Sequence, residues 1–292
     1  MMQKIENTHS GCKMALSVYL ACMLSLVIPG LSDAQVISAS QEELVKIALK
    51  NKYCLTLRFN EFPAYAFHLW LPELAIFDSD LDRSRAAKPI NGVWLARRQG
   101  NLQVSGRLTT GNKRMDFKCT LKPLSTSAIM LALEVINAGQ QDWTDYTQLA
   151  VCLAPAEGNA AFSDTTGERS YINPQHTLIH SITGVGVVGD FNHYAVGDRN
   201  DPADSIQRSR VKDGFVARES SDGKISISFM WENAARVDVN PGGLDCIHSH
   251  PAAGPLKAGE SKSLNGYIMI REGTARDHYT LMKELIDKYP DK

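Results

Sequence analysis

Hydrophobic and polar residues alternate along much of this chain. Apolar side chains recur at every second position most clearly over residues 102–108, 116–122 and 225–231. This period is typical of strands that bury one face and expose the other. Further apolar, β-branched runs are separated by turn signals such as Asp222-Gly223, and they cover residues 129–136, 149–153, 177–182 and 264–270. The pattern predicts an all-β fold, a large antiparallel β-sandwich.

Helical periodicity is confined to two short segments near the ends. Ser40 and Glu43 form a capping-box pattern that predicts a helix to about Leu49. A second predicted helix covers residues 274–289, with apolar side chains at helical spacing at Tyr279, Met282, Ile286 and Tyr289. No internal repeat or linker divides residues 35–292, so we expect one domain.

The N-terminal segment has the pattern of an export signal. Two lysines precede an apolar run at residues 14–28, Pro29-Gly30 follows it, and small residues at Ser32 and Ala34 offer a cleavage point. The alternative is an uncleaved membrane anchor, but the run is shorter than the ~20 residues that a bilayer span needs. We therefore expect residues 1–34 to be a signal peptide and the protein to be secreted or periplasmic, with no membrane contact after cleavage.

The charge balance argues against a nucleic-acid partner. The formal net charge is −1 at pH 7, and basic pairs such as Arg97-Arg98 and Lys113-Arg114 are scattered among carboxylates. Nucleic-acid binders concentrate basic residues on one face. The sequence contains no such concentration.

Four cysteines follow the predicted signal peptide, at Cys54, Cys119, Cys152 and Cys246. They can pair in three ways, and an oxidising compartment permits disulfides without requiring them in a domain of this size. Buried free thiols are an equal alternative. The alternation around Cys119 places it on an inner face with Phe117 and Leu121.

The candidate chemistry centres on residues 246–251, which read Cys-Ile-His-Ser-His-Pro. If this segment is extended, the Cys246 thiol and the His248 and His250 imidazoles lie on one face. The string resembles the zinc motif of the JAMM metalloproteases, but Ala258 and Ser261 stand where that family needs a Ser and a ligating Asp. That family is therefore excluded.

The same segment resembles the first metal motif of the cupins, but the Glu and the late His of that family are missing. The nearest glutamate is Glu260, and the only later histidine, His278, lies in the predicted terminal helix. We therefore expect no bound metal and no cofactor. One alternative stays open, in which the two histidines and Cys246 or a distant carboxylate hold a metal ion.

Eight segments between residues 55 and 273 together resemble a known fold family. They are residues 135–137, 151–155, 162–164, 168–172, 231, 246–251, 256–261 and 264–268. In this order they resemble uncharacterised exported proteins with a galactose-mutarotase-like β-supersandwich. The resemblance implies a fold that sugar epimerases and domains of polysaccharide lyases and glycosidases use, as well as proteins without known activity.

Three residues are the predicted acid–base catalysts. His248 and His250 titrate near neutral pH and can exchange protons with a sugar, and Glu232 is the candidate carboxylate partner. The alternative is that both histidines lie at a strand end and bond neighbouring carbonyls. An enzyme or a binding module would hold both histidines and Arg169 in a concave cleft.

Five further residues are candidates for contact with the substrate. Arg169 could clamp an anionic sugar, with Tyr171 on the same side, or it could anchor a loop through a salt bridge. Trp231 could stack on a sugar ring, although its alternation favours the core. His193 and Tyr194 belong to an irregular stretch typical of functional loops.

Two other histidines, His68 and His180, sit in apolar strands and are expected to be core or edge residues. The sequence therefore predicts an exported, carbohydrate-directed protein, with an epimerase- or lyase-like enzyme as one form. The expected partner is a poly- or oligosaccharide, with an anionic one as an option. The alternative functions are a non-catalytic carbohydrate-binding module and a structural protein of the cell envelope.

Overall fold

The computed structural model describes the following parts of the chain: residues 36–38, 44–52, 54–79, 87–98, 101–172, 179–180, 194–196, 214–240 and 245–289. All of them belong to one unit, Ala34–Lys292. The predicted signal peptide lies outside them. Among these residues, no helix is long and apolar enough to cross a membrane.

The described strands form two antiparallel sheets, which we call sheet A and sheet B. Sheet A contains, in spatial order, β1 (Val36–Ser38), β2 (Val45–Asn51), β3 (Cys54–Phe59), β4 (Ala66–Ile76), β9 (Thr147–Pro155), β16 (Cys246–Ala253), β15 (Ala234–Asn240) and β12 (Tyr194–Val196).

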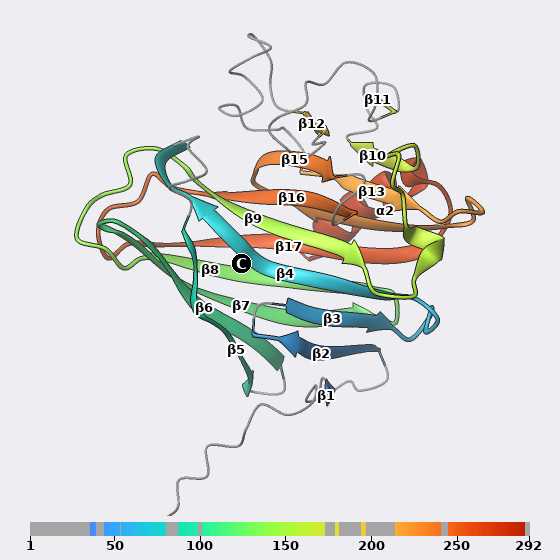
Figure 1. Cartoon of the computed structure of the whole chain (residues 1–292), viewed down its shortest axis with the longest axis horizontal. Helices are drawn as coiled ribbons and strands as arrows, with labels where there is room; N and C mark the ends of the chain where they lie inside the picture. Colours follow the sequence, from blue (N-terminus) through green and yellow to red (C-terminus); the bar gives the residue numbers. More distant parts are fainter. Residues whose placement is uncertain are drawn as a thin grey trace, which may run out of the picture. The chain divides into compact units, whose positions relative to one another are not determined.

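Sheet B contains β11 (Ile179–His180), β10 (Ser170–Ile172), β13 (Val216–Glu219), β14 (Ile225–Trp231), β17 (Ser261–Glu272), β8 (Ala128–Asn137), β7 (Lys113–Ser125), β6 (Asn101–Thr110) and β5 (Lys88–Arg98). In Figure 1, β4 and β9 of sheet A lie in front of β7, β8 and β17 of sheet B. The expected antiparallel β-sandwich is confirmed.

The core lies between the two sheets because each strand turns its apolar residues inward. Every second residue of β6 and β7 is buried over most of its length. Phe117, Cys119 and Leu121 are all almost completely buried in this core. The expected inner-face position of Cys119 is therefore confirmed.

The chain crosses between the sheets several times, and this brings distant segments together. Strand β9 lies between β4 and β16, although β16 comes far later in the sequence. His248 of β16 stands opposite Cys152 of β9, and Cys152 stands opposite Trp70 of β4. Side chains from three separate parts of the chain therefore meet on one face of sheet A.

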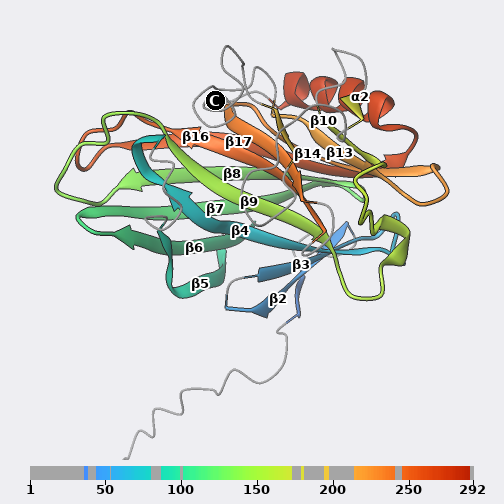
Figure 2. The ribbon, with the colours of Figure 1, turned by 45° about the horizontal axis from the view of Figure 1, so that its top comes forward.

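The outer face of sheet B is covered by the C-terminal helix α2 (Ala275–Lys288), which Figure 2 shows beside β13 and β14. Thr274 and Asp277 form a capping box at its start, which satisfies backbone N–H groups of the first turn. Tyr279 and Met282 pack against Phe215 and neighbouring residues of the sheet. The predicted C-terminal helix is confirmed.

The helix expected near the N-terminus is wrong, because the segment is strand β2. Val45 and Ile47 are fully buried and Lys46 between them is exposed, which is a strand period. Strand β2 pairs with β1 on one side and β3 on the other. Long-range pairing thus outweighs the local capping pattern at Ser40 and Glu43, which lie outside the described residues.

Candidate functional site

The outer face of sheet A carries the segment 246–251. Ile247 belongs to the core between the sheets, and the Ser249 hydroxyl also points inward, since it accepts a hydrogen bond from the Trp231 N–H (3.2 Å) and donates one to the Gly214 carbonyl (2.6 Å). Because side chains alternate along a strand, Cys246, His248 and His250 lie on the outer face. The sequence predicted that these three side chains share one face.

The two imidazoles are stacked and almost completely buried. The His248 and His250 rings lie 5.3 Å apart and nearly parallel, at 11°. The exposed fractions of these residues are 5% and 4%. The His250 Nδ1 atom lies 3.3 Å from the Leu149 carbonyl oxygen. This agrees better with strand histidines that bond a neighbouring carbonyl than with rings in an open cleft.

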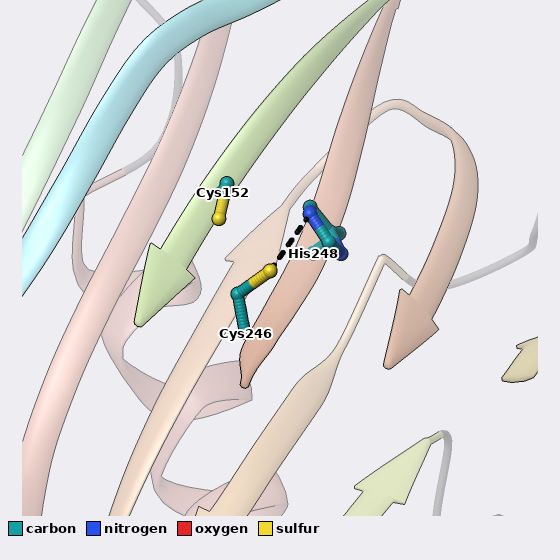
Figure 3. Close-up of side chains that lie close together, drawn as sticks. All are labelled: Cys152, Cys246 and His248. Carbon is teal, nitrogen blue, oxygen red and sulfur yellow. Dashed lines mark hydrogen bonds between the residues drawn. The ribbon is translucent and has the colours of Figure 1, made fainter. Parts of the chain in front are cut away.

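Two thiols lie beside the first of these imidazoles. Figure 3 shows Cys152 on β9 facing Cys246 and His248 on β16. The two sulfur atoms and an imidazole nitrogen all lie within 4.8 Å of one another, and the Cys246 Sγ to His248 Nε2 distance is 3.4 Å. None of the four described cysteines forms a disulfide bond in the structure. This cluster is the group of described residues with the donor atoms to hold a metal ion.

A second polar cluster lies on the same face, around His68 of β4. The His68 Nε2 atom is 2.7 Å from Glu157 Oε2 and 2.8 Å from the Lys50 Nζ atom. Lys50 also pairs with Glu157, and His68 Nδ1 is 3.3 Å from the Thr56 hydroxyl. His68 is buried, whereas the side chain of Glu157 is 78% exposed. A titratable ring and a carboxylate therefore share one contact that solvent can reach.

The charge state of this second cluster follows from its contacts. Hydrogen bonds from Lys50 and then from His68 lower the pKa of Glu157 to about 2. The carboxylate is thus ionised at any ordinary pH and stabilises a positive charge on its partners. Nε2 of His68 accepts from Lys50 when it carries no proton, and it donates to Glu157 when it does. Both protonation states of the ring have a partner.

An aromatic side chain joins the two clusters. Trp70 is half-buried and packs against Cys152, Ala154 and Cys246. Its ring meets the His68 ring edge-on, at 6.0 Å between centroids. The outer face of sheet A therefore presents an indole between an acid–base cluster and a thiol–imidazole cluster.

The structure corrects the position expected for Glu232. Its carboxylate accepts a hydrogen bond from the Tyr267 hydroxyl at 2.9 Å. Tyr267 and Met230 belong to the apolar cluster under helix α2, on the outer face of sheet B. Glu232 alternates onto the same side as Met230. It therefore lies across the sandwich from His248 and His250 and is not their acid–base partner.

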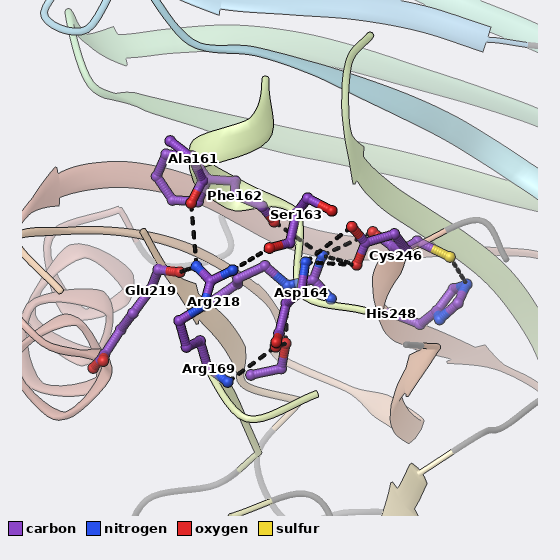
Figure 4. Close-up of polar contacts among 11 residues, drawn as sticks. Ala161, Phe162, Ser163, Asp164, Arg169, Arg218, Glu219, Cys246 and His248 are labelled. Atoms are coloured by element: carbon purple, nitrogen blue, oxygen red, sulfur yellow. Dashed lines mark hydrogen bonds and ion pairs between the residues drawn. The ribbon is translucent and has the colours of Figure 1, made fainter. Parts of the chain in front are cut away.

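Arg169 contacts the backbone of its own surroundings. Its guanidinium donates to the carbonyls of Ala161 (3.1 Å), Glu219 (2.8 Å) and Ser163, as Figure 4 shows. The Tyr171 hydroxyl donates to the Glu219 carboxylate at 3.1 Å, so Arg169 and Tyr171 both contact Glu219, the first at its backbone carbonyl and the second at its side chain. Burial, followed by the Glu219 charge, raises the pKa of Tyr171 to about 12. Arg169 anchors the loop before β10 through carbonyls instead of a salt bridge.

Among the described residues, Arg218 is the most buried charged group, and the sequence did not indicate it. It is 1% exposed and donates to Asp245 Oδ1 and to the Asp245 carbonyl, both at 2.8 Å, and to the Ser170 hydroxyl at 2.9 Å. Burial lowers the pKa of Arg218, while the nearby charges of Asp245, Asp164 and Cys246 act in the opposite direction. Asp245 immediately precedes Cys246, so this network fixes the start of β16 (Figure 4).

The structure places Trp231 in the core, as its alternation favoured, and this excludes the candidate stacking role. The side chain is fully buried in the core, where its indole lies against Gly266. A Cβ atom at Gly266 would come within 2.6 Å of the ring, so only glycine fits there. His193 lies outside the described residues, and Tyr194 is described only by its backbone in β12.

Sequence reading missed Lys50, Glu157 and Cys152 as site residues. Glu157 reaches His68 over 89 positions of sequence, and no local pattern carries such a contact. One signal was available, since His68 and Trp70 are two residues apart and therefore share a strand face. Cys152 lies opposite His248 only because β9 and β16 are neighbours in sheet A, which the sequence does not indicate.

No protein-family model matches this sequence, and no curated protein is similar to it. Several solved structures are similar to this chain, and we describe three of them, whose names refer to sugars. A galactose mutarotase-like protein from Lactobacillus casei matches 82% of this chain and 100% of its own at 11% identity and a TM-score of 0.43. A galactose mutarotase related enzyme from Lactobacillus acidophilus matches 83% of this chain and 98% of its own at 10% identity and a TM-score of 0.43.

The third is an α-mannosidase from Enterococcus faecalis, of which 30% matches 85% of this chain at 9% identity and a TM-score of 0.45. The matched structures thus include galactose mutarotase-like proteins, the family that the sequence resembles. The chemistry of this chain rests on its own side chains.

Proposed function

We propose that this chain is an exported, carbohydrate-directed protein that catalyses proton transfer on a sugar at the outer face of sheet A. The observation that carries the proposal is the contact of His68 Nε2 with both Glu157 and Lys50, at 2.7 and 2.8 Å. The export part rests on the N-terminal sequence pattern alone.

His68 is the proton-transfer group in this proposal. A carboxylate with a pKa as low as that of Glu157 is a poor base, so its role is to orient the ring and to stabilise the imidazolium. His68 removes the proton of the hydroxyl on the anomeric carbon, which displaces the Lys50 ammonium from Nε2. A carbonyl forms at that carbon, its bond to the ring oxygen of the sugar breaks, and Lys50 donates a proton to this oxygen. The open sugar then closes again as the other anomer. Each group regains its original state in the return step.

The substrate class follows from the neighbouring side chains. The faces of an indole pack well against the apolar face of a pyranose, and Trp70 is half-buried next to His68. Thr56, Lys50 and Glu157 supply the hydrogen-bonding groups that sugar hydroxyls need. The exposed Arg58 alternates onto the same face as Thr56 and offers a positive charge to an anionic sugar.

The test measures binding and catalysis separately. Thermal shifts with a panel of neutral aldoses and their uronic acids report binding, and NMR exchange spectroscopy reports interconversion of anomers. We expect His68→Gln to slow the interconversion by about a hundred-fold or more, because acid–base catalysis contributes about that much. Glu157→Gln should slow it less, since it leaves the imidazole in place.

The matched control is Glu134→Gln, which breaks an exposed pair with Lys118 (3.0 Å) on sheet B and should leave the rate unchanged. If the wild-type protein binds a sugar without interconverting its anomers, the enzyme proposal fails and the binding-module alternative replaces it. If no sugar shifts its melting temperature, the carbohydrate proposal fails as a whole.

A further inference from the structure

The cluster of Cys152, Cys246 and His248 takes no part in the proposed reaction, yet it brings together two thiols and an imidazole. The register of β9 and β16 produces this meeting, because Cys152 stands opposite His248 and Cys246 is two residues from His248 on the same face. All three side chains come from regular strands, which hold their backbones in fixed positions (Figure 3).

From this cluster we propose that Cys152, Cys246 and His248 are ligands of a zinc-binding site.

The distances in the cluster match those of a zinc site. With Zn–S near 2.3 Å and Zn–N near 2.0 Å, tetrahedral angles place sulfur and nitrogen roughly 3.6 Å apart and two sulfurs roughly 3.8 Å apart. The Cys246 Sγ to His248 Nε2 distance is 3.4 Å, and all three donor atoms lie within 4.8 Å of one another. An ion can therefore bind through small side-chain rotations, without movement of the strands.

The donor set selects the kind of metal. Thiolates are soft ligands that favour zinc over calcium and magnesium, which take oxygen ligands. Two cysteines and one histidine with a fourth position left to water or a ligand is a known zinc arrangement. Binding of Zn²⁺ displaces one proton from each thiol, and the resulting site of two thiolates and a neutral imidazole has no net charge.

The cluster is buried and lies next to a buried cation. The exposed fractions of Cys152 and Cys246 are 1% and 0%, so the two thiols are shielded from bulk water. The buried Arg218 guanidinium lies near enough to Cys246 to interact with it electrostatically. The Arg218 bonds to Asp245 also hold the residue that precedes Cys246.

The second imidazole supports the first. His250 stacks on His248 at 5.3 Å with nearly parallel rings, and its Nδ1 atom lies near the Leu149 carbonyl. Such packing restricts rotation of the His248 ring, which is the usual role of groups around a metal ligand. His248 is therefore assigned to the metal, and His68 to the sugar.

The experiment uses the purified full-length chain, stripped of metal with a chelator under reducing conditions and then titrated with Zn²⁺ or Co²⁺. We expect one zinc ion per chain by mass spectrometry. The Co²⁺ form should show a thiolate-to-metal charge-transfer band, whose intensity rises with the number of thiolate ligands, and visible bands of tetrahedral cobalt.

Four alanine variants form a matched series. Cys152→Ala and Cys246→Ala should weaken zinc binding by at least about a hundred-fold, since changes outside the ligand shell alone cost 10- to 100-fold in known sites. Cys54→Ala and Cys119→Ala should bind like the wild-type protein, because burial raises the pKa of both thiols and neither belongs to the cluster. Circular dichroism checks that each variant is folded.

Three outcomes would overturn the proposal. The first is wild-type protein that takes up no zinc after reduction. The second is copper in the purified protein at one ion per chain with no exchange for zinc. The third is a Cys152–Cys246 disulfide, detected as a mass two hydrogens lower before reduction, which re-forms in preference to metal uptake. The cobalt spectrum of the wild-type chain is decisive even if a variant does not fold.

The zinc proposal and the proposed function can be tested independently of each other. Glu157→Gln should alter sugar turnover and leave zinc binding unchanged, because Glu157 contacts Lys50 and His68 and not the thiols. Zinc uptake by a chain that ignores sugars would support the metal site and remove the proposed function.

Discussion

Two regions on the outer faces of the two sheets are built from the same strand alternation but carry different kinds of side chain. Where helix α2 covers sheet B, the outward positions include the apolar Phe215, Tyr267 and Met269. On sheet A the outward positions include His68 and the Cys152, Cys246 and His248 cluster. A helix thus packs on the apolar outward residues, and the titratable outward residues mark the face where chemistry can occur.

Arg218 holds Asp245 at the start of β16 in sheet A, and its replacement should cause the largest loss of stability. Arg218→Met leaves the Asp245 carboxylate without its buried cation, which should cost about 3–5 kcal/mol of the free energy of unfolding. The matched variant Arg107→Met breaks a partly exposed pair with Asp116 and should cost about 1 kcal/mol or less. Urea denaturation measures both. Equal losses would contradict the distinct role of Arg218.

A substitution at Met282 tests the packing of helix α2 on sheet B. Its side chain is fully buried between α2 and the sheet, so Met282→Ala should cost about 2–5 kcal/mol through lost burial and a cavity. Glu284→Ala on the exposed side of α2 should change stability by about 0.5 kcal/mol or less. Met282→Ala should leave zinc affinity unchanged, and a parallel loss of both would show that the two faces are not independent.

His278 gives the helix-covered face a pH dependence. Its ring lies 3.0 Å from the Ser228 hydroxyl and 3.1 Å from the Arg271 carbonyl, and burial lowers its pKa from 6.5 to about 4. The unfolded chain therefore binds the proton more readily, so the contribution of the neutral ring is complete above pH 6.5 and is lost as the pH falls toward 4. The loss should be on the order of 3 kcal/mol.

Thermal denaturation of the wild-type protein and of His278→Gln across this range measures the difference. The variant should lose less stability than the wild-type protein between pH 6.5 and 4. Identical pH profiles would show that burial does not lower the pKa of His278 in the folded protein.

Zinc binding to the cluster on sheet A should change the free energy of unfolding by less than the substitutions above. Free zinc at a hundred times its dissociation constant should raise the free energy of unfolding by about 2.7 kcal/mol, if it binds only the folded chain. Scanning calorimetry with and without zinc measures this gain, which Cys246→Ala should abolish and Cys119→Ala should keep. A gain that survives Cys246→Ala would locate the bound metal elsewhere.

The sequence predicted the parts of this molecule that depend on local periodicity. Period-two alternation predicted β6, β7 and β14, and period 3.6 predicted α2. The same alternation correctly placed His248 and His250 on one face. It failed at β2, where a capping pattern competed with a strand period and pairing on both sides decided the outcome.

The candidate site depended on contacts that alternation does not contain. Alternation places Glu232 opposite Trp231 and beside Met230, but nothing in the sequence said that this strand and the strand of His248 would belong to different sheets. Glu157 reaches His68, and Cys152 reaches His248, only because β9 lies between β4 and β16. Strand order is set by the packing of the whole sandwich, so these partners could not be read from their own surroundings.

The claim that the outer face of sheet A is the functional face has a direct test in the indole ¹⁵N–¹H spectrum, which contains one signal for each of the four tryptophans. Trp70→Phe assigns the signal of Trp70. Titration with the sugar that gives the largest thermal shift should move this signal and the His68 ring resonances, while those of His278 under α2 stay fixed. A titration that moves the His278 resonances and leaves Trp70 and His68 unchanged would contradict the account.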